Sequence, residues 1–220
     1  MSSNKQATGY NGNNNLPKAG SRYSLTQEQL EEYKKCLDSP SYFAENYFKI
    51  VSLDDGLQTI KLYDFQKEAA NAYLETNKLL LATSRQIGKT TIATVIVLHY
   101  ALFNEHKTTF VLGNKAATAH EVLGRIKLAY EYLPMWLKPG VVEWNKTSIE
   151  FENGSKIVSA ATSSDGIRGK SCISGDSNVC LELEDETLSG EKIDSYYYNS
   201  INYFKTHISD FMYDEHVYSS

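Results

Sequence analysis

Residues 84–91 read SRQIGKTT and combine a glycine, a lysine and hydroxyl side chains at a spacing that suits phosphate binding. In such a loop the backbone N–H groups face phosphate oxygens, and the dipole of the following helix favours their negative charge. Gly88 would permit the turn, Lys89 would reach the β- and γ-phosphates, and the Thr90 hydroxyl would ligate Mg²⁺. The predicted site for ATP and Mg²⁺ comprises Ser84, Arg85, Gln86, Ile87, Gly88, Lys89, Thr90 and Thr91.

The context of this loop strengthens a motif that is weak alone. The general pattern is G-x-x-x-x-G-K-[ST], and here Thr83 replaces its first glycine. Residues 79–83 form a short apolar run that predicts a buried strand, and residues 89–103 predict a buried helix. A strand before the loop and a helix after it are what a phosphate-binding loop requires.

A second chemical candidate is Cys172, within the stretch RGKSCISGDSNVC at residues 168–180. Its thiol could attack the carbonyl of Ser171 and turn that amide into a thioester, because a thiolate is a strong nucleophile near neutral pH. The alternative is a small buried cysteine without a chemical role. The composition changes at the same position: residues 172–220 hold ten acidic residues and two lysines, a charge of −8, whereas the remainder carries +3.

The elements that would position these residues alternate between helix and strand. Helices are expected after a capping box at Ser24–Gln27, and at residues 41–50, 64–76, 89–103 and 116–132. Strands are expected at residues 79–83, 108–112, 148–151 and 156–161, the last two joined by a hairpin turn at Asn153-Gly154. This order predicts an α/β fold with a parallel sheet and flanking helices. Residues 1–21 are polar and predict a disordered leader.

Composition favours a soluble protein of a reducing cytoplasm. The longest nearly apolar run, residues 92–103, is too short to span a bilayer, so no membrane partner is expected. The three cysteines form neither a paired framework nor a zinc-site spacing.

The loop and three further segments resemble the ATPase domain of tailed-phage terminase large subunits, which pump DNA into proheads. SRQIGKTT resembles that family's deviant Walker A motif, and KLYDFQKE its adenine-contacting segment. LPMWLKPGVVEWNKTSIEFENGS and SSDGIRGKS follow in the same order. Covering residues 39–171, the resemblance implies part of a P-loop NTPase domain in which Gln66 contacts adenine and Arg85 stabilises charge on the γ-phosphate. Without it, Gln66 would be a solvated helix residue and Arg85 the partner of a nearby carboxylate.

The resemblance breaks off where the family has a Walker B strand ending in acidic residues. Residues 171–220 contain no such strand, and the nearest imitation, residues 181–186, alternates leucine with glutamate as a half-exposed strand does. The family's nuclease domain is absent as well. We therefore expect the chain alone to bind nucleotide poorly and to hydrolyse it hardly at all.

The segment CISGDSNVCL resembles the opening of an intein, a Hint-type β-rich domain that excises itself from a precursor. The T-x-x-H motif and the terminal His-Asn pair of inteins are not found in residues 172–220. The resemblance thus implies a split intein, with a complementary polypeptide carrying the rest of the intein and of the terminase. The expected divisions are a leader at 1–21, an ATPase portion at 22–171 and an intein fragment at 172–220.

The sequence thus predicts a precursor fragment in an infected bacterial cell that is joined to its other half by trans-splicing. After splicing, the resemblance implies double-stranded DNA, the portal and the small terminase subunit as partners. Three alternatives stay open. They are an unspliced, divergent ATPase with Glu184, Asp185 or Glu186 as its acids, a truncated reading of a contiguous intein gene, and a non-catalytic phage assembly module.

Overall fold

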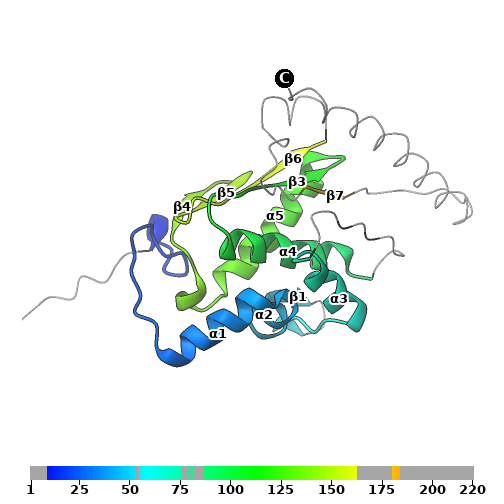
Figure 1. The fold of residues 1–220 in the computed structure, drawn as a ribbon. Helices are drawn as coiled ribbons and strands as arrows, with labels where there is room; N and C mark the ends of the chain where they lie inside the picture. The colour runs from blue at the N-terminus through cyan, green and yellow to red at the C-terminus, as the bar shows by residue number, and fades with distance from the viewer. Residues whose placement is uncertain are drawn as a thin grey trace, which may run out of the picture. The chain divides into compact units, whose positions relative to one another are not determined.

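A computed structural model describes residues 9–52, 55–75, 79, 81 and 87–162, together with the backbone of residues 180–183 (Figure 1). All of them lie in the first of two units, Met1–Glu184. The helices are α1 (Gln27–Asp38), α2 (Pro40–Tyr47), α3 (Asp64–Ala72), α4 (Lys89–Phe103) and α5 (Ala116–Glu131), with short 3₁₀ turns η1 (Tyr10–Gly12) and η2 (Met135–Leu137). The strands are β1 (Lys49–Ser52), β2 (Gly56–Thr59), β3 (Thr108–Gly113), β4 (Val141–Trp144), β5 (Ser148–Phe151), β6 (Lys156–Ala161) and β7 (Cys180–Leu183).

The main sheet has the strand order β4-β5-β6-β3-β7. Strand β3 runs parallel to β6 and β7, whereas β4, β5 and β6 are antiparallel to one another. The sheet is therefore mixed, and the expectation of a parallel sheet is wrong for its β4–β6 half. The reason is the turn at Gly154, whose φ of 77° reverses the chain directly and leaves no crossover helix between β5 and β6.

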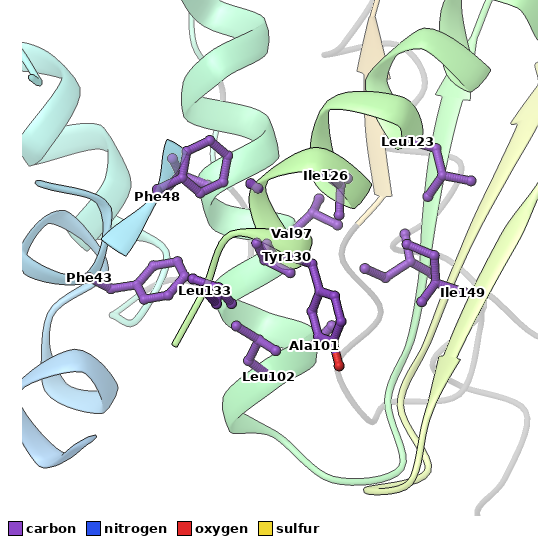
Figure 2. Close-up of a cluster of buried hydrophobic side chains, with 14 of the residues drawn as sticks. Phe43, Phe48, Val97, Ala101, Leu102, Leu123, Ile126, Tyr130, Leu133 and Ile149 are labelled. Atoms are coloured by element: carbon purple, nitrogen blue, oxygen red, sulfur yellow. The ribbon is translucent and has the colours of Figure 1, made fainter. Parts of the chain in front are cut away.

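The helices form two layers on one face of this sheet (Figure 1). Helices α4 and α5 contact the sheet, and α2 and α3 pack against the other side of α4. Figure 2 shows Val97 and Ala101 of α4 directed toward Ile126 and Tyr130 of α5, in one cluster with Ile149 of β5. Because α4 is apolar nearly all round, residues 92–102 are all buried, which confirms the expected helix at its predicted bounds.

The N-terminal residues depart from the predicted disordered leader. Leu16 is only 3% exposed within the main core. The Val141 N–H donates to the Pro17 carbonyl at 2.7 Å, and the Ala19 N–H donates to the Val141 carbonyl at 3.3 Å. Composition cannot reveal one buried leucine and one backbone pairing, so the prediction is wrong for residues 9–21; residues 1–8 lie outside the described part.

Local signals placed some helix ends incorrectly. Helix α1 is capped by Thr26 and Gln29, with Thr26 Oγ1 accepting from the Gln29 N–H at 3.2 Å and Gln29 Oε1 accepting from the Thr26 N–H at 3.0 Å. The capping box expected at Ser24 and Gln27 is therefore two residues early. Helix α2 ends at Tyr47 because the following residues pair as β1 with β2, a hairpin that was not predicted.

The remaining elements agree with the sequence or lie outside the described residues. Strand β3 and helix α5 match their predicted ranges within one residue, and β5 and β6 match them fully. Helix α3 is shorter than expected, ending at Ala72. The strand predicted at residues 79–83 is described only at Leu79 and Leu81 and stays a prediction. Among the described helices, none is both long enough and apolar enough to cross a membrane.

Candidate functional site

The described part of the predicted phosphate site is the start of α4. Gly88 is the N-cap residue and adopts a left-handed conformation, with φ 83° and ψ 25°, that other residues rarely adopt. Lys89, Thr90 and Thr91 form the first turn and are half-buried. Residues 82–86, which include Ser84, Arg85 and Gln86, lie outside the described residues, so their roles stay predictions.

The start of α4 has the electrostatic character of an anion site. The first N–H groups of a helix have no partner within it, and together they carry a partial positive charge. In α4 the first intrahelical bond runs from the Ile92 N–H to the Gly88 carbonyl, at 3.1 Å, and no acidic residue lies in the first turn. The turn that carries Lys89 is therefore suited to negatively charged ligands.

Gln66 joins this turn to helix α3. Its side chain is 5% exposed, so the alternative of a solvated helix residue is wrong. Its Nε2 donates to the Ile87 carbonyl at 2.9 Å, and its Oε1 accepts from the Tyr63 N–H at 3.0 Å. A Cβ atom on Gly88 would lie 2.6 Å from that same Nε2, so a larger residue at this position would have to displace the amide.

The amide of Gln66 retains hydrogen-bonding capacity beyond these two bonds. A glutamine amide has two N–H donors and two oxygen lone pairs, and the bonds to Ile87 and Tyr63 use one of each. A donor beside an acceptor is the pattern that glutamine uses on the N6 and N7 edge of adenine. The geometry is thus compatible with the predicted adenine contact.

An aromatic pair that the sequence reasoning missed lies beside Gln66. The rings of Tyr63 and Phe65 stack with centroids 6.0 Å apart and an interplanar angle of 6°. Tyr63 is 70% exposed and Phe65 is 41% exposed. The aromatic residues of KLYDFQKE are visible in the sequence. Only the exposure of Tyr63 and Phe65 in the structure distinguishes them from aromatic residues of the core.

Two other features help to delimit the site. An open cavity of about 300 Å³ lies at the opposite end of α4 and is lined among others by Phe103, Trp136 and Asn153. Among the described residues, no three His, Cys, Asp or Glu side chains are grouped as metal ligands.

Strand β7 belongs to residues 172–220, which the sequence analysis assigned to the intein fragment, and it adds a fifth strand to the main sheet. Its backbone pairs in parallel with β3, with Phe110 opposite Cys180 and Gly113 opposite Leu183. Parallel strands end at the same edge of a sheet, so the chain leaves β7 toward residues 184–186 at the edge where β3 ends. Ser171, Cys172 and residues 184–186 lie outside the described residues.

Residues 80–180 match the family described as "Terminase large subunit, T4likevirus-type, N-terminal". The match covers α4, β3, α5 and the strands β4–β6, and it continues beyond Ser171 as far as Cys180. It begins after Gln66, which it therefore does not include. The match supports a phage terminase N-terminal region and hence a fragment of a DNA-packaging terminase.

Proposed function

We propose that the chain supplies the ATP-binding portion of a phage terminase large subunit and is joined to the remainder by protein trans-splicing. The observation that carries the first part is the start of α4: Gly88 and Lys89 open a buried helix within a segment similar to the terminase family. The second part rests on the sequence at Cys172. The two parts are tested separately.

In the ATP site, Lys89 binds the β- and γ-phosphates and the Thr90 hydroxyl ligates Mg²⁺. Arg85 stabilises the charge that develops on the transferred phosphoryl group. Gln66 contacts adenine with its second N–H and second lone pair while keeping its bond to Ile87. The exposed, stacked pair Tyr63 and Phe65 precedes Gln66 in the same helix turn and offers an aromatic surface for the adenine ring.

In the splicing reaction, the Cys172 sulfur attacks the carbonyl carbon of Ser171. The C–N bond of that amide breaks, a C–S bond forms, and the released nitrogen takes a proton to become the free amine of Cys172. The partner polypeptide then accepts the acyl group from this thioester. The charge of −8 on residues 172–220 would attract a basic partner fragment and speed its association. After splicing, the partners are double-stranded DNA, the portal and the small terminase subunit.

Nucleotide binding is tested by titrating the full chain with a fluorescent ATP analogue and Mg²⁺. We expect weak, saturable binding that Lys89→Ala reduces by about tenfold or more, a change of about 1.4 kcal/mol. Lys146→Ala is the control, because Lys146 is an exposed lysine in the β4–β5 turn. Equal affinities of the two variants would contradict the proposal.

Splicing is tested by peptide mass spectrometry on infected cells. We expect a tryptic peptide that begins at Ser171 and continues directly into new sequence with an apolar strand and an acidic pair. If SCISGDSNVCLELEDETLSGEK is the only peptide that begins there, no splicing occurs and Cys172 is structural.

The position of β7 favours a second candidate, an unspliced and divergent ATPase. Because β7 is parallel to β3 in the sheet, Glu184, Asp185 and Glu186 follow a strand that ends at the edge where β3 also ends. Acidic residues that follow a parallel strand at this edge can ligate Mg²⁺ and orient the attacking water. This candidate predicts that the isolated chain hydrolyses ATP, that Glu184→Gln or Asp185→Asn abolishes hydrolysis, and that Cys172→Ala leaves it unchanged.

A further inference from the structure

We infer that Asn153, in the turn between β5 and β6, is a positioning residue for the nucleotide site. It holds the C-terminal end of α4, the helix whose N-terminal end carries Lys89. The inference rests on the proposed ATP-binding function. The Asn153-Gly154 turn would then both reverse the chain and position α4.

The contacts of Asn153 close the end of α4. Its Nδ2 lies 2.9 Å from the Ala101 carbonyl oxygen, 3.1 Å from that of Asn104 and 3.4 Å from that of Leu102. Ser155 Oγ also donates to the Asn104 carbonyl, at 2.6 Å. The last carbonyls of a helix have no partner within it, and α4 is buried here, with Ala101 at 0% exposure. Side chains of the turn therefore replace the water that would otherwise satisfy them.

The surrounding bonds fix the direction of the amide. Asn153 Oδ1 accepts from the Ser155 N–H at 3.0 Å, so the opposite side of the amide, Nδ2, must face α4. The His106 N–H donates to the Asn153 carbonyl at 3.0 Å, which ties the link between α4 and β3 to the same turn. Gly154 has a φ of 77°, and a Cβ atom on it would overlap the His106 ring. Any other residue at position 154 would strain the backbone and would have to displace the His106 ring.

The hydrogen bonds of Asn153 help to fix the position of α4 along the helix axis. A helix of 15 residues is about 22 Å long and moves nearly as a rigid rod. The apolar side chains around α4 resist sideways movement. Besides His99 in the interior of α4, which bonds to the Cys36 carbonyl, polar contacts at the two ends of the helix help to define its axial position. Those contacts are Gln66 with Ile87 at the start and Asn153 with Ala101 at the end. Losing the second set allows the first turn, with Lys89, to shift relative to the loop.

The decisive variant is Asn153→Asp in the full 220-residue chain, with Asn153→Ala as the milder change. Aspartate has the same shape but no N–H, and its charge opposes the negative end of α4. The matched control is Glu152→Gln, in the same turn. Glu152 accepts from the Gly140 and Gly20 N–H groups, both at 2.8 Å, so its carboxylate ties the turn to these residues rather than to α4, and its loss loosens the turn on the other side.

Two measurements separate positioning from stability. The first is the Kd of a fluorescent ATP analogue with Mg²⁺, well below the lowest Tm of the set. We expect Asn153→Asp to weaken binding about tenfold and Glu152→Gln to change it less than twofold. The second is amide hydrogen exchange in residues 88–94, at the far end of α4. We expect it to accelerate in Asn153→Asp and to stay unchanged in Glu152→Gln.

The outcomes are distinguishable. If Asn153→Asp and Glu152→Gln bind nucleotide equally well, or if exchange in residues 88–94 responds to neither, the inference is wrong and Asn153 only stabilises the fold. If the unmodified chain binds no nucleotide, the proposed function fails. The exchange measurement then decides by itself whether Asn153 controls the first turn of α4. Should Asn153→Asp not fold, Asn153→Ala gives the same comparison.

Discussion

Gln66 Nε2 lies 2.9 Å from the carbonyl oxygen of Ile87, so one buried amide connects the first turn of α3 to the residue before the N-cap of α4. The Ile87 carbonyl and the amide satisfy each other in a part-buried hydrogen bond. Any ligand that moves the loop must therefore either keep this bond or break it. The contact between Gln66 and Ile87 and the adjacent Gly88 lead to the first two predictions.

Replacing Gln66 with alanine is expected to weaken both the fold and nucleotide binding. The change leaves the Ile87 carbonyl and the Tyr63 N–H without their partner, which costs about 1–3 kcal/mol of unfolding free energy. Gln27→Ala is the control, because Gln27 is exposed on α1 and such changes stay within about 0.5 kcal/mol. Urea unfolding measures the difference, and equal losses in the two variants would contradict it.

Gly88→Ala is expected to destabilise the chain where Gly124→Ala stabilises it. At Gly88 the positive φ alone costs about 1–2 kcal/mol for alanine, and its Cβ would lie 2.6 Å from Gln66 Nε2. Gly124 lies within α5, and a Cβ there meets nothing within 4 Å. Alanine at residue 124 should gain about 0.5–1 kcal/mol.

Thermal unfolding of the two variants checks this contrast. A double variant, Gly88→Ala with Gln66→Ala, separates the two causes. The second change removes the overlap but leaves the backbone strain, so the double variant should be less destabilised than the sum of the single ones. Strict additivity would show that Gln66 does not contact residue 88.

Buried His99 is expected to make the fold sensitive to acid. Its ring is 1% exposed, and Nε2 donates to the Cys36 carbonyl at 2.7 Å while Nδ1 accepts from the Tyr73 hydroxyl. Burial lowers the pKa of His99 to about 4, from 6.5 in the unfolded chain. The stabilisation from neutral His99 is therefore complete above pH 6.5 and is lost as the pH falls toward 4, by about 3 kcal/mol in total.

Unfolding free energies at pH 7 and pH 5 measure this effect. At pH 5 the unfolded chain is already protonated at residue 99 while the folded chain is not, so about 2 kcal/mol should be lost. His99→Gln keeps polar groups near Cys36 and Tyr73 but does not titrate. The loss between the two pH values should be smaller in this variant, and an equal loss would assign the acid sensitivity to other groups.

Lys138 is expected to hold the N-terminal residues against the core. Its side chain is 7% exposed, and Nζ donates to the carbonyls of Asn15 and Glu131, both at 2.8 Å. Lys138→Met keeps most of the apolar stem but removes both bonds. Residues 9–21 should then detach more often, so trypsin should cleave after Lys18 several-fold faster. Lys146→Met, at an exposed lysine, should leave the cleavage rate unchanged.

Sequence reasoning succeeded where a local pattern decides the structure. Helix α4 was predictable because nearly every residue is apolar, and the β5–β6 hairpin because Asn153-Gly154 favours one turn. The cap of α1 was misplaced because Ser24 and Thr26 both suit an N-cap, and only the surrounding chain selects Thr26. The hydrogen bonds of Asn153 to α4 were not predictable, because they join residues about fifty positions apart.

The candidate site was predictable in its residue types and not in its connections. The motif located Gly88 and Lys89 at the start of a helix, and the structure agrees. It could not indicate that Gln66 fills the space above Gly88, because this depends on how α3 packs against α4. For Arg85 and Cys172 the sequence remains the source of the proposals.

The pairing of residues 17–19 with Val141 also bears on the solubility of the protein. Strand β4 stands at one end of the sheet order, and an end strand with free backbone groups invites another chain to pair with it. Here the Val141 N–H and carbonyl are taken by Pro17 and Ala19. A protein shortened to begin after residue 21 would uncover the backbone of Val141 at this edge and would be expected to self-associate more readily.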